Sequence, residues 1–384
     1  MHVDEAHLID LLARMVRTES VNPSLDPAGA GEADIAALLA DEARELGMHV
    51  DLLDAGPART SVIATLPGAG GGRSLMLNGH IDTVSVVGMS DALSGRVEDG
   101  RLYGRGAFDM KGGVAACFGA LRALRDAGVR LAGDLVIAAV ADEEFESLGM
   151  QQVVHVRPTD AAIVTEPTAL RTCVAHKGFV WVGVEAHGRA AHGSRPDLGV
   201  DANRAMARLI AALEPLHDEL ANTRPHPLLG RGSFHVGTMF GGAGVSTYAE
   251  RCEATFERRT LPGEHARAFV DAITIAADQL QADDGRAQYV VRELLVREPF
   301  EAAPDSPIVA CVQRAREASL PAAPVVGDSV WMDAAILHAA GIDTVVIGPT
   351  GAGAHAAEEW VEVDSVVRLA AILARAAADY CGAA

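Results

Sequence analysis

Short runs of aliphatic residues alternate with longer amphipathic segments along most of this chain. Five runs have the length of a β-strand and few polar residues, as expected for strands buried on both faces. They are SVIATL (61–66), SLMLN (74–78), LVIAAVA (135–141), AAIVT (161–165) and TVVIG (344–348). The segment 112–128 carries a helical apolar stripe and ends at Gly128, a typical C-cap. This alternation predicts an α/β domain with a mostly parallel sheet.

The pattern changes between residues 178 and 297. We expect there a strand, a helix, two strands, a helix and a strand, the β-α-β-β-α-β order of a ferredoxin-like α+β domain. The α/β pattern resumes near residue 308 and ends in a helix over 364–380, with Asp364 as the expected N-cap. The chain is therefore predicted to form one α/β domain, residues 1–176 and 298–384, with an inserted domain, residues 177–297.

Composition narrows the possible functions. The 384 residues are 49% hydrophobic, which is enough for the cores of two domains. The formal net charge is -20 and no block of Lys or Arg offsets it, so a nucleic-acid partner is not expected. The N-terminal segment MHVDEAHLIDLLARMV lacks the pattern of a signal peptide, and no run approaches the roughly 18 apolar residues of a membrane helix. We therefore expect a soluble, cytoplasmic protein that acts on small molecules without a membrane partner.

The cysteines favour a reducing environment. They are odd in number, scattered and without CxxC spacing, which is typical of packed thiols rather than of disulfides or a cysteine zinc site. They are Cys117, Cys173, Cys252, Cys311 and Cys381.

Residues that bind metals well follow four of the predicted strands. Open α/β sheets bind ligands at the carboxyl ends of their strands, so these side chains should converge on one crevice. They are His80 and Asp82, then Asp142, Glu143 and Glu144, then Glu166, and finally His355 at the end of a glycine-rich loop. Asp109, in GRGAFDMKGG (104–113), comes just before the helix at 112 and joins them.

The acidic run 142–144 has two interpretations at this point. Carboxylates are stabilised at a helix N-terminus by free backbone N–H groups and by the helix dipole, so the run could simply begin a helix. Alternatively, it supplies metal ligands or a catalytic base. The run alone does not distinguish these roles.

Seven ordered blocks resemble the co-catalytic zinc aminoacylase/carboxypeptidase family, which contains acetylornithine deacetylase, succinyl-diaminopimelate desuccinylase and aminoacylases. The resemblance covers residues 78 to 360, nearly the whole chain. The blocks are NGHIDTV, YGRGAFDMKGG, ADEEFESLG, TEP, GRAAHGSRPDLGVDAN, RRTLPG and GAHAAEEW. The resemblance implies a zinc-hydrolase catalytic domain. It also implies that the insertion forms a lid and dimerisation domain, and therefore that the protein is a homodimer.

The resemblance also implies a two-metal site. His80 and Glu166 would bind one ion, Glu144 and His355 the other, and the carboxylate of Asp109 would bridge both. Zinc suits this mixture of imidazole and carboxylate ligands, with cobalt or manganese as possible substitutes. Three carboxylates against two divalent ions leave a positive charge that acidifies a bridging water.

The remaining catalytic roles also come from the resemblance. Glu143 would be the general base, and Asp82 would fix the tautomer of the His80 imidazole, although a turn residue is the simpler role for it. Asp142 is expected to be structural, and a cis peptide is implied at Asp109–Met110.

In the inserted domain, the resemblance gives two residues substrate-side roles. His192 would donate a hydrogen bond to the developing oxyanion, often across a dimer interface, and Arg259 would hold the substrate α-carboxylate. Arg258 alternates to the other strand face and is expected to meet solvent.

The chain departs from the family pattern at a few positions. Ser246 and Ala249 stand where Asn and Pro are common, and Glu358 replaces Asn or Asp, while Glu359 keeps the acidic position. Residues 176–178 resemble the entry to the lid and are expected to be the hinge.

The sequence therefore predicts a two-metal amidohydrolase that cleaves an N-acyl bond beside a free carboxylate, as in acetylornithine deacetylase. Desuccinylase and dipeptidase or carboxypeptidase activities are the alternatives. A binding protein that has lost catalysis is the alternative from another class, which the complete ligand set disfavours.

Overall fold

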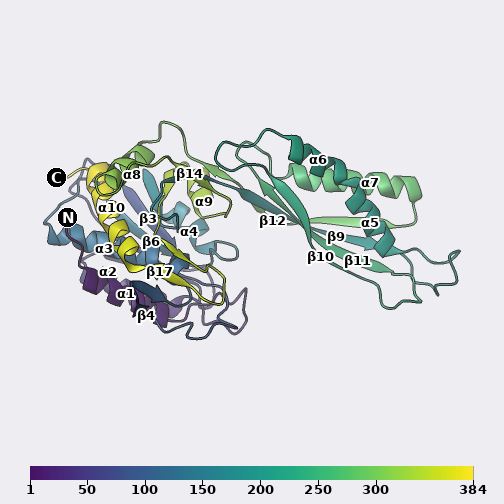
Figure 1. The fold of residues 1–384 in the computed structure, drawn as a ribbon, viewed down its shortest axis with the longest axis horizontal. Helices are drawn as coiled ribbons and strands as arrows, with labels where there is room; N and C mark the ends of the chain where they lie inside the picture. Colours follow the sequence, from purple (N-terminus) through teal and green to yellow (C-terminus); the bar gives the residue numbers. More distant parts are fainter. Residues whose placement is uncertain (384) are drawn as a thin grey trace. The chain divides into compact units, whose positions relative to one another are not determined.

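The computed structural model describes residues 1–383, which form two compact units (Figure 1). Unit 1 contains residues 1–174, 302–326 and 332–383, and unit 2 contains residues 175–301 and 327–331. The predicted boundaries after residues 176 and 297 lie near these limits. The segment 327–331 also belongs to unit 2, where Trp331 Nε1 donates to the carbonyl of Glu298 at 3.1 Å. No local sequence pattern predicts this assignment.

Unit 1 is built on a sheet with the strand order β1-β2-β6-β3-β7-β15, and β8 follows β15. The central strands β6, β3, β7 and β15 are parallel, while β1 and β2 are antiparallel and extend one edge. The bounds are β1 His49–Asp54, β2 Thr60–Leu66, β3 Leu75–His80, β6 Leu135–Val140, β7 Ala161–Val164, β8 Cys173–His176 and β15 Asp343–Val346. The predicted mostly parallel α/β sheet is therefore confirmed at its centre.

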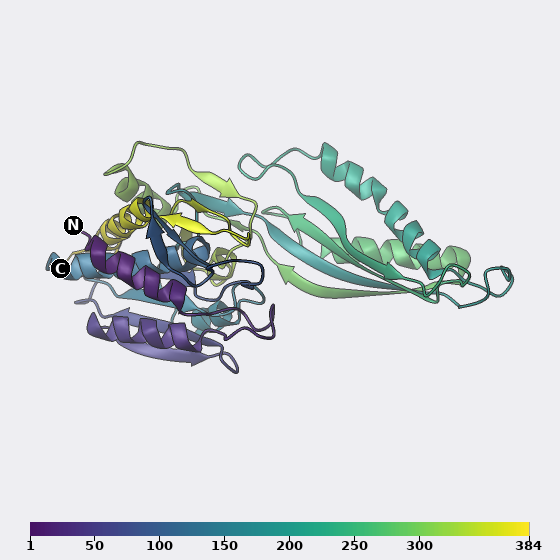
Figure 2. The same ribbon diagram turned by 60° about the horizontal axis from the view of Figure 1, so that its bottom comes forward.

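Helices cover both faces of this sheet. One group packs with Leu75, Leu77, Leu135 and Ile137 in a single apolar core, because alternate strand residues point to the same face. It contains α1 Glu5–Arg17, α2 Ala33–Glu45, α3 Gly112–Asp126, α8 Pro307–Glu317 and α10 Val363–Cys381. Helices α4 Leu148–Val156 and α9 Ala334–Ala339 contact the sheet separately. Figure 2 shows α1, α2 and α10 beside the sheet strands.

Two helix ends test the expectations from the sequence. The backbone after α3 turns at Gly128, which has the positive φ of 68° that glycine adopts without strain. The last helix begins at Val363, so Asp364 lies in its first turn and the prediction that it is the N-cap is wrong. Asp364 instead pairs with Arg368 one turn later, at 2.6 Å.

A small second sheet in unit 1 has the order β16-β17-β5-β4. Its strands are β4 Arg96–Glu98, β5 Arg101–Tyr103, β16 Gly351–Ala352 and β17 Trp360–Glu362. A short irregular helical turn, η1 Ala107–Lys111, connects β5 to α3. This sheet supports the two loops that carry Asp109 and His355.

Unit 2 has the predicted ferredoxin-like order with one additional helix, α6, before the second strand; its sheet is arranged β10-β11-β9-β12, with helices on one side of it (Figure 2). Alternate residues of β9 are buried, as a strand with one helix-covered face requires. The elements are β9 Gly178–His187, α5 Ala202–Ala212, α6 Glu214–Asn222, β10 Ser233–Gly241, β11 Arg251–Thr260, α7 Ala268–Asp284 and β12 Gln288–Arg297. Two further short strands are β13 Phe300–Glu301 and β14 Val326–Asp328.

All five cysteines are buried free thiols, in agreement with their predicted packing role. Within residues 1–383, every helix is too short or too polar to span a bilayer.

Candidate metal centre

Three strand ends of unit 1 bring acidic and imidazole side chains together. His80 is the last residue of β3, the run 142–144 begins two residues beyond β6, and Glu166 lies two residues beyond β7. Since β3 pairs in parallel with both β6 and β7, their carboxyl ends lie at the same edge of the sheet. The convergence predicted for these residues is therefore present in the structure.

Asp109 reaches the same place from η1. The Asp109–Met110 peptide bond is cis, as the family resemblance implies. The carboxylate of Glu359 accepts the backbone N–H groups of Phe108 at 2.9 Å and Asp109 at 3.0 Å. Arg105 holds Glu359 in turn, through a buried ion pair of 2.7 Å. Glu359 and Arg105 thus position the backbone that presents Asp109.

The two carboxylate oxygens of Asp109 face two different imidazoles. Oδ1 lies 3.1 Å from His80 Nε2, and Oδ2 lies 3.3 Å from His355 Nε2. Glu166 Oε1 is 3.5 Å from His80 Nε2, and Glu144 Oε2 is 3.0 Å from His355 Nε2. A carboxylate placed between two histidine-carboxylate pairs has the arrangement that bridging two cations requires.

The donor atoms are close enough to bind metal ions. Those of His80, Asp109 and Glu144 lie within 4.8 Å of one another, and so do those of His80, Glu143 and Glu166. Glu143 therefore lies beside the predicted ligands, with its Oε2 4.0 Å from His80 Nε2. The mixed nitrogen and oxygen donors fit zinc, and also cobalt or manganese.

The role of the His80 ring is set by its second nitrogen. Nδ1 lies 3.0 Å from the backbone carbonyl of Asp82, which can only accept a hydrogen bond, so Nδ1 carries a proton. Nε2 would then be free to offer its lone pair to a bound cation. The Asp82 carboxylate is further from Nδ1, at 3.5 Å, and instead accepts the N–H groups of Glu143 and Glu144. Asp82 therefore orients the acidic run as well as the imidazole.

The cluster carries more negative charge than its protein partners balance. Burial raises the pKa of Glu143, Glu144 and Glu166, and neighbouring carboxylates raise it further against the opposing charge of His80. Hydrogen bonds to Asp109 and Glu144 raise the pKa of His355 to about 10. Within residues 1–383, none of these carboxylates forms an ion pair with Lys or Arg. Divalent cations would supply the missing positive charge, so the residues present fit a two-metal site.

Two buried groups near the cluster were not found from the sequence. Lys111 is 1% exposed and its Nζ donates to the carbonyls of Met15 and Thr18, while burial lowers its pKa to about 7. Asn22 is fully buried and donates to the Asp82 carboxylate at 2.8 Å. A single Lys in a glycine-rich block and an Asn before a proline give no local signal of such contacts.

The predicted substrate-side residues belong to unit 2. His192 is exposed and its Nδ1 lies 2.9 Å from Ser194 Oγ. The neighbouring N–H of Gly193 donates to the carbonyl of Ser246, so that departure from the family pattern lies in the loop beside His192. Arg259 forms an ion pair with Glu257 at 2.7 Å. The roles of His192 and Arg259 toward a substrate stay predictions.

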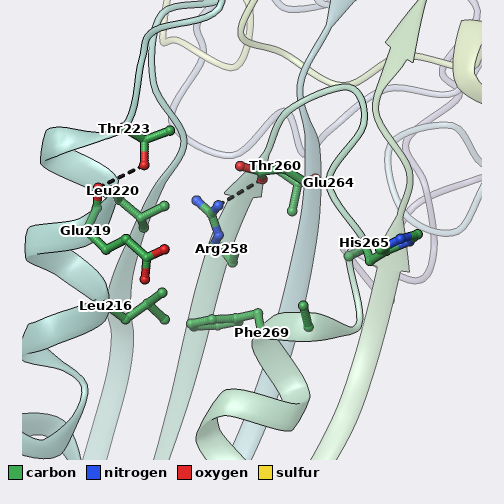
Figure 3. A pocket seen from close by; sticks show the side chains of 11 residues that line it. Leu216, Glu219, Leu220, Thr223, Arg258, Thr260, Glu264, His265 and Phe269 are labelled. Carbon is green, nitrogen blue, oxygen red and sulfur yellow. Dashed lines mark hydrogen bonds and ion pairs between the residues drawn. The ribbon is translucent and has the colours of Figure 1, made fainter.

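The prediction that Arg258 meets solvent is wrong. Arg258 is 6% exposed, and its guanidinium forms an ion pair with Glu264 at 2.8 Å. The reason is that even-numbered residues of β11 face the helix-covered side of the sheet, where α6 closes over the strand end. Arg258 lines a cavity of about 340 Å³. Figure 3 shows its guanidinium with Glu219 and Leu216 of α6 across from it.

Comparison with known proteins agrees with this description. Residues 76–379 match the model of peptidase family M20/M25/M40. The chain is 32% identical over 339 residues to an acetylornithine deacetylase of Myxococcus xanthus, covering 86% of each chain.

Two solved structures share the fold. Aminopeptidase PepT of Bacillus cereus superposes with a TM-score of 0.83 at 20% identity, covering 99% of this chain and 100% of that one. The YXEP protein of Bacillus subtilis, described as a dinuclear metal binding peptidase, gives 0.74 at 14% identity, covering 97% of each chain. With its fold, its ligand cluster and a family match over most of its length, this chain is a member of peptidase family M20/M25/M40, a family of metal-dependent amide and peptide hydrolases.

Proposed function

We propose that this protein hydrolyses the amide bond of an N-acyl amino acid, in the manner of acetylornithine deacetylase. The observation that carries the proposal is the position of Asp109, whose two carboxylate oxygens face the imidazoles of His80 and His355 at 3.1 and 3.3 Å. This arrangement supports a pair of bridged divalent cations, and the 32% identity to an acetylornithine deacetylase supports the substrate class.

One ion would be held by His80, Asp109 and Glu166, and the other by Glu144, Asp109 and His355. Zinc is the proposed metal, and cobalt and manganese suit the same donors. When bound, the ions would polarise the scissile carbonyl and increase the acidity of the attacking water.

Glu143 is the proposed general base. Its backbone N–H is fixed by Asp82 at 3.1 Å, and its carboxylate borders the ligands. The Glu143 carboxylate accepts a proton from the attacking water as the new C–O bond forms. It then delivers that proton to the leaving nitrogen as the C–N bond breaks, which releases a carboxylic acid and an amine.

Unit 2 is the proposed lid and dimerisation domain, with residues 176–178 as its hinge. Arg259 would bind the α-carboxylate of the substrate, and His192 would donate to the developing oxyanion. The edge strand β10 supports a homodimer, because it exposes Met239 and Phe240, the latter at 71%, beside unpaired backbone groups. A cytoplasmic location would suit a reaction on amino-acid derivatives.

A substrate panel tests the proposal. The protein, loaded with zinc or with cobalt, is assayed on N-acetyl amino acids, N-succinyl diamino acids and dipeptides. We expect the highest kcat/KM on an N-acetyl amino acid. A clear preference for succinyl substrates or dipeptides would move the assignment to a desuccinylase or a dipeptidase. A metal-loaded protein without activity on any of them would indicate a binding protein.

A further inference from the structure

A buried arginine lies behind the acidic run, away from the predicted ligands. Arg59, immediately before β2, is 5% exposed, and its guanidinium contacts four side chains. Nε pairs with Glu32 at 2.9 Å, Nη1 donates to Asn22 Oδ1 and to Ser24 Oγ, both at 3.1 Å, and Nη2 pairs with Asp142. A buried guanidinium with this many directed contacts holds its partners in fixed positions.

The most constrained of these partners is Asp142. Its φ of 73° is in the left-handed region, which is unfavourable for a non-glycine residue and persists where the surroundings enforce it. Oδ1 is held by Arg59 and by Asn22, and Oδ2 accepts the N–H of Leu148 at 3.3 Å. The main-chain carbonyl of Asp142 accepts the N–H of Ser147. The first residue of the turn that presents Glu143 and Glu144 is therefore fixed by hydrogen bonds to both its side chain and its main chain.

Asn22 joins this turn to the residue beside the metal ligand His80. Its Nδ2 donates to Asp82 Oδ2 at 2.8 Å and to Asp142 Oδ1 at 3.0 Å, while its Oδ1 accepts from Arg59. The side-chain amide has only one orientation that satisfies two carboxylates and a guanidinium. Asn22 thus fixes the spacing between two buried acidic residues that would otherwise repel each other.

Asp82 completes the connection. Its carboxylate accepts the N–H groups of Glu143 at 3.1 Å and Glu144 at 3.2 Å, and its backbone carbonyl accepts Nδ1 of His80. Three steps of hydrogen bonding therefore lead from Arg59, through Asn22 and Asp82, to the backbone N–H groups of Glu143 and Glu144 and to the imidazole of His80. Within residues 1–383, Asn22 reaches the cluster through Asp82 and Asp142, and Arg59 reaches it through Asn22 and Asp142.

We propose that Arg59 and Asn22 are positioning residues of the metal centre. They hold the Asp142 turn and Asp82 in place, so that Glu143 is positioned as the base and Glu144 as a metal ligand. The inference rests on the proposed metal-dependent hydrolase. Residues that orient the ligands from behind typically change metal affinity or activity by about 10–100-fold when they are removed.

The test compares Arg59→Lys and Asn22→Ala with a matched control, Arg316→Lys. Arg316 is an equally buried arginine of unit 1 (7% exposed) whose guanidinium donates to the carbonyls of Leu170, four residues after Glu166, and Pro321, and not to Asp82 or to the Asp142 turn. Each full-length variant is titrated with Co²⁺ while the visible absorption of the bound ion is recorded. Its kcat and KM are measured on the best substrate of the parent protein, together with its thermal unfolding.

We expect both variants at the site to bind Co²⁺ at least tenfold more weakly, with a changed absorption spectrum and kcat lowered about 10–100-fold at a KM within threefold of the parent. Arg316→Lys should lower thermal stability but leave the spectrum, the Co²⁺ affinity and kcat unchanged. If Arg59→Lys does not fold, Asn22→Ala, which removes no charge, decides the question.

Parent-like Co²⁺ affinity and kcat in Arg59→Lys or Asn22→Ala, or equal losses in Arg316→Lys, would overturn the proposal. A parent protein that binds no Co²⁺ would overturn it as well. A parent that binds Co²⁺ but hydrolyses nothing would refute the proposed function alone, because the Co²⁺ affinity and spectrum still test the positioning role.

Discussion

His80 and His355 face the same carboxylate, Asp109, from very different surroundings. The His80 side chain is 1% exposed, stands at the end of a central strand and has its second ring nitrogen bonded to a backbone carbonyl. The His355 side chain is 55% exposed and lies in the loop between β16 and β17, with a left-handed φ of 59°. One imidazole is held by the core of unit 1, and the other by a loop in contact with water.

This difference indicates that one half of the metal centre is rigid before an ion binds and that the other half is mobile enough to adjust. A ligand already held in place loses little conformational freedom when it binds an ion, whereas ordering an exposed side chain costs about 0.5–1.5 kcal/mol. We therefore expect the His80 half of the centre to be preformed and the His355 half to adjust on binding. Glu143 and Glu144, though adjacent in the chain, lie on different sides of this division.

The largest expected effect separates these two neighbours. Glu143→Gln should lower kcat by about 10³–10⁴-fold with both ions retained, because the amide cannot accept the proton from water. Glu144→Gln should instead weaken binding of the ion shared with His355. Metal content and kcat of the two variants provide the measurement. Turnover of Glu143→Gln within a few-fold of the parent would return that residue to the helix-capping interpretation.

Removing each imidazole in the presence of a chelator compares the two halves without metal. His80→Ala should lower the free energy of unfolding by about 1–3 kcal/mol, because buried acceptors lose their donor. His355→Ala should cost less than about 1 kcal/mol, since water can replace a half-exposed side chain. Denaturant unfolding of both variants is the measurement. Equal losses would show that the two sites are equally part of the folded core.

The two ions should also bind with different affinities. The ion bound by His80 should be held about tenfold more tightly than the ion bound by His355, from the ordering cost of the exposed side chain. Calorimetric titration of the apoprotein with Zn²⁺ should resolve two steps, and His355→Ala should keep the tighter one. Loss of the tighter step in His355→Ala would reverse the assignment.

The last prediction concerns how the free energy of unfolding depends on pH near Glu32, behind the His80 half. Burial and the charge of Asp82 raise the pKa of Glu32 to about 8, against the opposing charge of Arg59. The folded state therefore keeps a proton that the unfolded state has released, so stability falls as pH rises from about 5 to 8. The slope is at most about 1.4 kcal/mol per pH unit for one group.

Glu32→Gln should flatten this part of the stability profile. Urea unfolding at pH 6 and pH 7 gives the comparison, with the parent protein measured alongside. An unchanged difference between the two pH values would mean that Glu32 is ionised in the folded protein and fully paired with Arg59.

Much of the fold could be predicted from the hydrophobic pattern. The aliphatic runs became β2, β3, β6, β7 and β15, because strands buried on both faces need apolar residues at nearly every position. Short edge elements such as β1 and β16 were not predicted, since two to six partly exposed residues carry no clear period.

The same limit applies to charged residues. Arg258 was expected in solvent, but α6 and Glu264 make its burial possible. Arg59 and Asn22 gave no local signal, because their partner Asp142 lies 83 and 120 residues away. The period of a strand or helix states which face a residue occupies, but not which distant side chain meets it there.

By itself, the sequence determined that His80, Asp109, Glu144, Glu166 and His355 would be present at strand ends and loops of an α/β domain, because alternation of strand and helix brings such ends to one edge. Only the tertiary structure decided how far Asp109 lies from the two imidazoles, that Asp82 binds the backbone of the acidic run, and that Arg59 stands behind it. Those contacts join segments far apart in the chain, and their geometry arises only when the strands, η1 and the β16–β17 loop are packed together.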